Sequence, residues 1–581
     1  MKTKNIIIPF VALGLAVTSC IDMDYTEEVL VEKDYVEQEF GDVGGFMTQL
    51  YKAVEYDFGQ FNNGAMSASA TDEAEFSKLG NTITDFYNGS WSPTNAHAGV
   101  WNSMYTAIQA ANHYIDFWQG LEFKDYELDL NYNARMHQYK NYFYEARFMR
   151  AYYYFTLNRY FGGVPLIKEG MGADELNKLS RNTSDEVFEY IFDECDAIKD
   201  EIVRDYNDLG EFALGQAETG RANKAAVLAL KARAALYWAS PLFNPNDDKE
   251  RYKYAADCYN ELFTECKETK KSLATTYAGL WGDDSFSNPR VVREIIFGYR
   301  YGSVGSPGDN YVESNNYPVG VQGGSGGNCP TQDLVDAYEM KNGKSIHEEG
   351  SGYDEKNPYK NRDPRLALTI AVNGEKWPTY SAATNLEIFE GGLNASPKTN
   401  ATTTGYYLKK LCNGAVNMAS GSTYTKSRHT YLNFRLGAAY LDFAEAVYKY
   451  TGSADVVMPG HTMSARDAVN AVRNRTGIKM PKITVSGDEF WAKLQNERRV
   501  ELAFEGHRFW DVRRWKEGPK WFSSITRCKI TKNVDPIDET KVTYTYEYEK
   551  VPRKWEDKYY FFPIPQTERM KNPNLEQNPD W

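Results

Sequence analysis

The sequence lacks long apolar runs beyond its first residues, and several chemically informative residue types are scarce. The apolar run Ile6 to Val17 is too short to span a bilayer as a helix. Only seven histidines occur, none in a His-Glu-x-x-His pattern, and no Asp-x-Asp-x-Asp-Gly loop is present, so neither zinc nor calcium has sequence support. The net charge of −14 argues against nucleic acid as a partner. We therefore expect no metal, no cofactor and no nucleic acid.

Cysteines are also few, with seven in 581 residues. Beyond Cys20 the other six are scattered. Cys258 and Cys266, if they share one helix, would lie about 12 Å apart, which is too far for a disulfide. We expect these six to be small core residues. Long Pro/Ser linkers and low-complexity tracts are absent too, which favours one large unit.

The first twenty residues have the three parts of a secretory signal. Lys2 and Lys4 precede the apolar run, and Thr18 and Ser19 are small. Val17-Thr18-Ser19-Cys20 resembles a bacterial lipobox, which implies that residues 1–19 are removed and that Cys20 is acylated. Several acyl chains would anchor the protein durably, because burial yields about 0.8 kcal/mol per CH2. A plain secreted protein is the alternative.

Aromatic residues are abundant: 43 Tyr, 29 Phe and 12 Trp make up 14% of the chain. Tyr and Trp combine an apolar face with a polar tip. Such side chains suit a core, a partner surface, or a site where sugar rings lie on aromatic faces.

Apolar residues recur in steps of three and four in several segments, which predicts amphipathic helices. These segments are 100–118, 146–160, 228–239 and 436–450. The last is expected to stop at Gly452, and Ser464 with Asp467 offers a capping-box start for a helix running to Gly477. Paired helices with large and small apolar residues are typical of tetratricopeptide repeats, although no clean 34-residue period is found.

Long polar stretches rich in Gly, Asn, Ser and Tyr separate the helical blocks, at 300–330 and 373–425. Loops of this length are usually functional or disordered. Residues 541–551, KVTYTYEYEKV, alternate with period two and predict a strand paired with 525–532. The predicted class is therefore mainly α: a tetratricopeptide-like helical scaffold with long irregular loops and a minor β element. The scaffold is expected over about 40–260 and 430–520, loop-rich insertions over 60–97 and 280–425, and a C-terminal strand and tail over 525–581, all in one domain, 20–581.

Several stretches are similar to the SusD/RagB family of glycan-binding lipoproteins of the Bacteroidetes outer membrane. They include YEARFMRAYYYFTLNRYFGGVPLI (144–167), PTQDLVDAYEMKNG (330–343), NERRVELAFEGHRFWDVRRW (496–515) and YYFFPIPQTERMKNPNLEQNPDW (559–581). The resemblance runs from the lipobox to the last residue. It implies a non-catalytic lipoprotein on the outer membrane, facing the cell exterior, that binds oligosaccharide or polysaccharide. It further implies delivery to a SusC-like TonB-dependent transporter, over which the protein closes as a lid.

Two other functions stay open. Related family members serve peptide uptake, so a peptide-capturing lid of the RagB type is one alternative. A surface glycoside hydrolase is the other, but Glu497, Glu501 and Glu505 would lie along one helix ridge beside arginines instead of facing each other across a cleft. We expect that ridge to be structural, with the pairs Arg498–Glu501, Glu505–Arg508 and Asp511–Arg514 three residues apart. His507 is interpreted as a helix-surface or core residue.

Glycan recognition needs aromatic faces and fixed polar groups on loops. The resemblance points to an aromatic residue and an Asn in the loop before the first long helix, and the predicted ligand-binding residues are Asp72, Glu73, Trp91, Asn95, Tyr301, Tyr311, Cys329, Arg365 and Tyr406. Several have an alternative role: Tyr301, Tyr311 and Cys329 could form a mobile rim or contact the transporter, and three others have a structural alternative. Asn95 could begin the helix, Trp91 could pack under the loop, and Arg365 could pair with an acid to hold the fold.

Overall fold

The structure is a computed structural model that describes residues 33–206, 220–282, 285–301, 310–380, 382–419 and 427–581. Cys20 and the predicted signal 1–19 lie outside these residues. The fold is mainly helical, which confirms the predicted class. No helix in the described ranges is long and apolar enough to cross a membrane.

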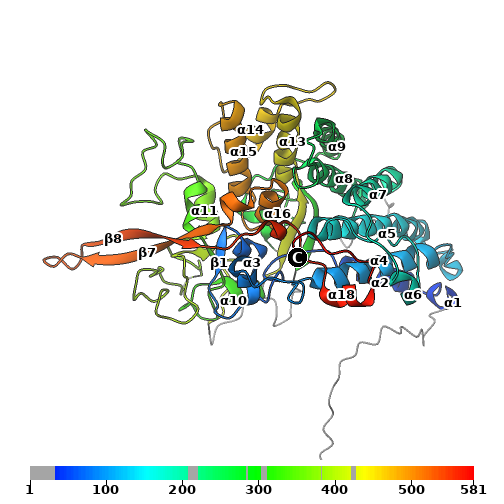
Figure 1. Ribbon diagram of the computed structural model, residues 1–581, viewed down its shortest axis with the longest axis horizontal. Helices are drawn as coiled ribbons and strands as arrows, with labels where there is room; N and C mark the ends of the chain where they lie inside the picture. The colour runs from blue at the N-terminus through cyan, green and yellow to red at the C-terminus, as the bar shows by residue number, and fades with distance from the viewer. Residues whose placement is uncertain (1–32, 207–219, 283–284, 302–309, 381, 420–426) are drawn as a thin grey trace, which may run out of the picture.

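The helices are α1 (Lys33–Val36), α2 (Phe40–Tyr51), α3 (Asp85–Asn88), α4 (Gly99–Phe117), α5 (Tyr132–Phe161), α6 (Ala173–Leu176), α7 (Ser184–Ile198), α8 (Lys224–Ala239), α9 (Lys249–Glu268), α10 (Tyr311–Asn316), α11 (Gln332–Ala337), α12 (Pro364–Thr369), α13 (Leu436–Thr451), α14 (Ala465–Arg473), α15 (Gly487–Glu501), α16 (His507–Arg514), α17 (Gly518–Trp521) and α18 (Gln566–Lys571). Consecutive long helices pack side by side: α4 on α5, α5 on α7, α7 on α8 and α8 on α9. The series continues from α9 to α13 and from α13 to α14 and α15 (Figure 1). This succession of packed neighbouring helices is the arrangement expected of a tetratricopeptide-like scaffold.

The strands form two-stranded antiparallel pairs. They are β1 (Ala74–Phe76) with β3 (Asn328–Pro330), β2 (Ile295–Tyr301) with β6 (His429–Arg435), β4 (Ile370–Ala371) with β5 (Tyr407–Leu408), and β7 (Ser524–Val534) with β8 (Val542–Pro552). The last pair is the predicted C-terminal hairpin, and it projects from the body at the opposite side from α4 and α5 (Figure 1).

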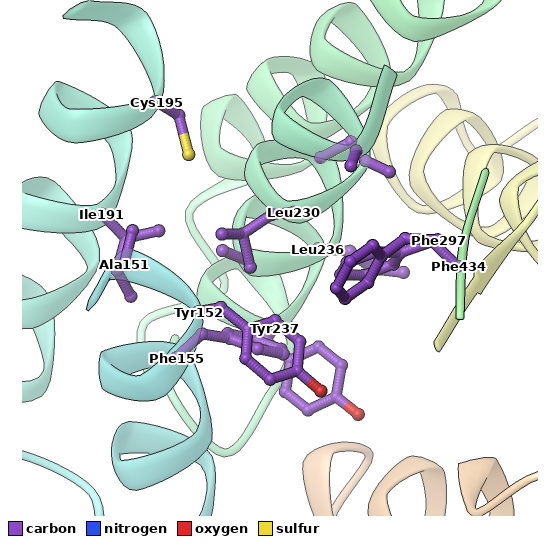
Figure 2. Packing of buried hydrophobic residues seen from close by; sticks show 14 of the residues in the cluster. Ala151, Tyr152, Phe155, Ile191, Cys195, Leu230, Leu236, Tyr237, Phe297 and Phe434 are labelled. Atoms are coloured by element: carbon purple, nitrogen blue, oxygen red, sulfur yellow. The ribbon is translucent and has the colours of Figure 1, made fainter. Parts of the chain in front are cut away.

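Two hydrophobic clusters form the core. The larger lies among the scaffold helices, where α5, α7 and α8 bring together Phe155, Ile191 and Leu236, and Phe297 and Phe434 of the β2–β6 pair pack against them (Figure 2). The smaller cluster lies under the loop region and contains Leu366, Tyr406 and Tyr407. The loop-rich insertion is thus packed around a core of its own.

The stretch 496–515 is not one continuous helix. α15 ends at Glu501 and α16 begins at His507, with Phe504 at φ 61° and Gly506 at φ 76° between them. A Cβ on Gly506 would lie 2.7 Å from the Tyr431 hydroxyl, so the turn requires glycine.

The predicted pair Glu505–Arg508 is wrong because it spans this break. The predicted pair Arg498–Glu501 is also wrong, although both residues belong to α15, because Glu501 instead contacts Arg365, Arg435 and Arg475. Arg498 contacts Asp442 and Asp511, and Arg508 contacts Asp72. Asp511–Arg514 is confirmed at 2.8 Å.

Candidate functional site

A cavity of about 450 Å³ lies where the loop after α2 meets α4, α5, α8, β6 and the α15–α16 turn. Its walls are largely aromatic, with Phe61, Tyr152, Tyr160, Tyr237 and Trp510 among the lining side chains. Tyr152 and Tyr237 are also part of the scaffold core (Figure 2). The cavity is therefore built partly on the scaffold core.

Fixed polar groups lie among these rings. Arg159 of α5 pairs with Glu55 at 2.6 Å and lies 4.3 Å over the Trp510 ring. Arg233 of α8 donates to the Asn433 backbone oxygen at 2.6 Å and lies over Phe434. The Asn433 side chain donates to the Glu55 backbone oxygen and to Tyr152, but its Oδ1 has no hydrogen-bond partner within the described structure.

His507 begins α16 and also lines the cavity. Burial, followed by the nearby Arg233 guanidinium, lowers the pKa of its imidazole to about 3. The ring is therefore neutral at physiological pH and can donate one hydrogen bond and accept another.

Four half-buried tyrosines, Tyr56, Tyr299, Tyr301 and Tyr311, stand at one side of the cavity, and we call them the tyrosine cluster. Tyr56 itself lines the cavity and stacks on Tyr299 with ring centroids 4.3 Å apart and planes inclined by 1°. Tyr301 lies 5.4 Å from Tyr56 and 6.3 Å from Tyr311. Burial and the neighbouring tyrosines raise the pKa of Tyr56 to about 12, so its hydroxyl stays protonated. The cluster combines apolar ring faces with hydroxyl groups.

The loop before α4 borders the cavity at another side. Asp85 accepts hydrogen bonds from Ser90, Asn95 and His97, and His97 lines the cavity. Burial acts to raise the pKa of the Asp85 carboxyl, but these three hydrogen bonds more than offset it and hold the pKa below its usual value. The exposed Asn95 is thereby fixed in place beside the cavity.

Comparison with known proteins shows which family has this sequence and architecture. A sequence model described as the SusD family matches residues 293–581, and a second, described as starch-binding associating with outer membrane, matches residues 31–236. A SusD-like protein of Formosa agariphila is 20% identical over 545 residues, which cover 89% of this chain and 90% of that protein. The chain belongs to the SusD family.

Solved structures share the fold. A SusD-like protein of Bacteroides fragilis superposes with a TM-score of 0.73 at 23% identity, covering 94% of this chain and 98% of the other. A SusD-like carbohydrate binding protein of the same organism gives 0.71 at 22% identity, covering 93% and 99%.

None of the nine predicted ligand-binding residues of this SusD-family chain lines the cavity itself. Three lie near it: Asn95 shares Asp85 with the cavity-lining His97, Tyr301 contacts the cavity-lining Tyr56, and Tyr311 contacts Tyr301. The other six have buried side chains: Asp72, Glu73, Trp91, Cys329, Arg365 and Tyr406. These six are held by contacts within the fold and present almost no surface to solvent.

Five of these six residues make contacts that hold parts of the fold together. Asp72 pairs with Arg499 and Arg508 at 2.8 and 2.9 Å. The Trp91 ring packs against Phe562 and Trp581, and its Nε1 donates to the Ala96 backbone oxygen.

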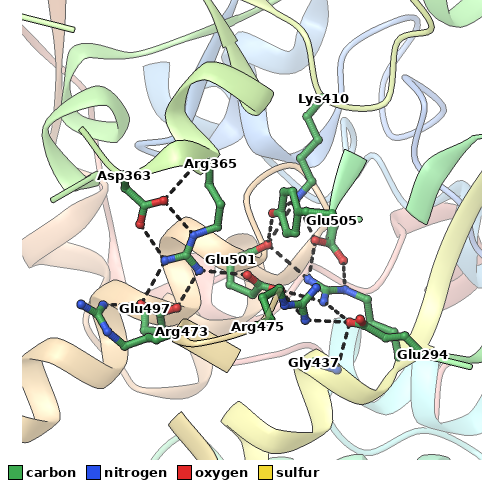
Figure 3. A network of polar contacts seen from close by, with 12 residues as sticks. Glu294, Asp363, Arg365, Lys410, Gly437, Arg473, Arg475, Glu497, Glu501 and Glu505 are labelled. Carbon is green, nitrogen blue, oxygen red and sulfur yellow. Dashed lines mark hydrogen bonds and ion pairs between the residues drawn. The ribbon is translucent and has the colours of Figure 1, made fainter. Parts of the chain in front are cut away.

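Arg365 is fully buried among Asp363, Glu497 and Glu501 (Figure 3). Cys329 of β3 lies opposite Glu75 of β1 in the register of that strand pair. The Tyr406 hydroxyl donates a hydrogen bond to the Gln332 side chain. Trp91 therefore packs beneath its loop, and Arg365 pairs with acids that hold the fold, as the structural alternatives for these two residues stated.

The residues that line the cavity were not predicted, among them Tyr56, Arg233, Asn433 and His507, and neither was Tyr299 of the tyrosine cluster. These five residues come from five separate segments, so no local pattern joins them. Within the described ranges, no group of three or more His, Cys, Asp or Glu side chains could hold a metal ion.

Proposed function

We propose that this protein is a non-catalytic outer-membrane lipoprotein that captures an oligosaccharide at the cavity and the tyrosine cluster. The observation that carries the proposal is the stacked Tyr56–Tyr299 pair at the edge of a cavity with fixed Arg, Asn and His side chains. Ring faces match the C–H side of a sugar, and the polar groups match its hydroxyls. The family relative described as carbohydrate binding supports the same class of ligand.

Transport is the second part of the proposal. The captured sugar passes to a SusC-like TonB-dependent transporter, and a ligand held between the two proteins favours closure of this chain over the barrel as a lid. The family description that names association with the outer membrane supports this location.

The absence of catalysis is also proposed. Glu501 and Glu505 are each held by two or more cationic side chains, and Glu55 is paired with Arg159. A glycosidase instead needs two carboxyl groups facing each other across the sugar, one of them kept protonated.

The binding test is calorimetry of the protein without its lipid anchor against plant, host and microbial oligosaccharides. Tyr299→Ala and Tyr301→Ala are expected to weaken binding of the preferred sugar by roughly tenfold or more, because each removes a ring face from the cluster. Tyr35→Ala, which removes an exposed tyrosine of α1, is the control and should bind normally. Binding of peptides but of no sugar would replace the proposal with peptide capture, and release of reducing sugar would contradict the absence of catalysis.

The anchoring test concerns Cys20. Cys20→Ala is expected to move the protein from the membrane fraction to the soluble fraction, because the acylated residue is lost. Retention of the variant in the membrane fraction would contradict lipid anchoring.

A further inference from the structure

We infer that the sugar accepted by the cavity is acidic: a hydroxylated ring that carries an anionic group, bound by Arg233 and its neighbours. This inference rests on the proposed function and narrows its ligand class. It follows from which charged and polar groups of the cavity already have partners and which do not.

Arg233 shares its counter-ion, Asp442, with a second arginine, Arg498. Its Nη1 donates to a backbone carbonyl, and its nearest carboxylate, Asp442, is 3.8 Å from Nε. Asp442 is already paired with Arg498 and accepts a hydrogen bond from Tyr259. Since the Arg233 side chain is only 12% exposed, its positive charge is largely withdrawn from water without a dedicated partner.

The acidic side chains of the cavity, in contrast, are satisfied. Glu55 accepts hydrogen bonds from Arg159 and Thr156, and Asp57 accepts from the backbone N–H groups of Gly59 and Ser67.

The third acid, Glu505, is held by Lys410 and Arg435. The three acids therefore have little capacity left to bind a cationic ligand, whereas Arg233 retains donors for an anion.

Two further buried atoms lack partners among the described residues. Arg159 Nε is an unpaired donor, and Asn433 Oδ1 is an unpaired acceptor on a residue that is 8% exposed. Both residues line the same cavity as Arg233. An unpaired buried polar atom costs free energy, which a ligand regains when it supplies the missing partner.

All three residues line one cavity, so their missing partners are assigned to one bound molecule. A carboxylate or sulfate oxygen accepts from Arg233 and Arg159, since a guanidinium presents parallel N–H donors to such a group. A hydroxyl on the same ring donates to Asn433 Oδ1. The aromatic walls cover the ring itself. A neutral sugar would satisfy the acceptor but would leave the Arg233 charge balanced only by the distant Asp442, which it shares with Arg498.

The experiment measures calorimetric affinity for oligosaccharides that differ only in the acidic group. Oligomers of galacturonate, mannuronate and glucuronate are compared with neutral galactose, mannose and glucose oligomers of the same linkage and length, and with a sulfated counterpart. At least one acidic oligomer is expected to bind tenfold or more tightly than its neutral counterpart. Raising NaCl from 50 to 500 mM should weaken that binding but not any neutral binding, because only an ionic contact is screened. The sulfated arm shows whether carboxylate or sulfate is preferred.

Arg233→Gln should reduce the acidic preference to threefold or less, and Arg233→Lys, which keeps the charge, should retain part of it. The matched control is Arg251→Gln, because Arg251 lies 4.3 Å over Trp238 but does not line the cavity. Tighter binding of every neutral oligomer, or an acidic preference unchanged in a folded Arg233→Gln, overturns the inference and leaves the proposed function intact. Binding of no sugar overturns both.

Discussion

Glu73 is a buried carboxylic acid whose Oε1 has no hydrogen-bond partner in the described structure. Burial, acting against the nearby Arg508, raises the pKa of its carboxyl to about 8. In the unfolded chain the same group has a pKa near 4.5. Between these values the folded state binds more protons than the unfolded state, so this group's contribution to stability is present below pH 4.5 and is lost as pH rises through 8.

Glu73→Gln removes this titration, because glutamine is neutral at every pH. The variant is therefore expected to melt at a higher temperature than the unmodified protein at pH 8 to 9, with the difference shrinking toward pH 5. Thermal unfolding at intervals from pH 5 to pH 9 measures this. Glu539→Gln, an exposed position in the β7–β8 turn, is the control and should follow the unmodified protein. A Glu73→Gln curve parallel to that of the unmodified protein would show that Glu73 does not titrate in this range.

Single residues were the least predictable part of the site. Trp91 and Tyr301 both stand in polar, glycine-containing stretches, yet Trp91 is 2% exposed and Tyr301 is half-buried at the cavity edge. What separates them is the C-terminal tail, whose Phe562 and Trp581 cover Trp91 from hundreds of residues away in sequence. The local composition around Trp91 does not indicate such a distant partner.

At the scale of elements, helices with strong boundary signals were predictable. The predicted Ser464–Asp467 capping box is present. Helix α13 ends at the predicted glycine, Gly452, whose backbone is left-handed. These signals lie within a few residues of the structure they set. The α15–α16 break was missed because the signal at Gly506 is one residue within a run of good helix formers.

The β7–β8 hairpin has a fixed base and a free tip. At its base, Thr526 is bound by Asp333, Arg527 pairs with Glu75, and Ile530 accepts from the Glu390 backbone. Toward the tip the side chains are exposed, with Ile537 at 95%.

Replacing residues 533–543 by Asn-Gly is therefore expected to leave the melting temperature within about 2 °C of the full chain, because a two-residue turn closes the remaining ladder at Lys532–Tyr544. Calorimetric unfolding measures the change. Arg527→Ala in the full hairpin is the comparison and should lower the melting temperature more, since it leaves Glu75 without its cationic partner. A larger loss from the shortened tip than from Arg527→Ala would mean that the tip contacts the body.

At the scale of the whole molecule, a buried ionic network joins the two hydrophobic clusters. Arg365 of α12, in the loop region, contacts Glu497 and Glu501 of α15 (Figure 3). Glu501 in turn contacts Arg435 at the end of β6 and Arg475 after α14. The mainly helical class was predictable from periodicity, but these links join residues up to 136 positions apart and were visible only in the structure.

Arg365→Ala should accordingly destabilise the whole protein. It leaves Asp363, Glu497 and Glu501 with less compensation in a fully buried position, and loss of one partner from a buried ion pair costs about 3–5 kcal/mol. Because Arg365 joins the loop region to the scaffold, the denaturant midpoint should fall by the same amount in tryptophan fluorescence and in far-UV circular dichroism. Lys124→Ala removes an ion pair whose side chains are 74% and 62% exposed, and its midpoint should hardly move. An Arg365→Ala midpoint equal to that of the unmodified protein would show that the network adds no stability, and a fall in one probe alone would show that the two clusters unfold independently.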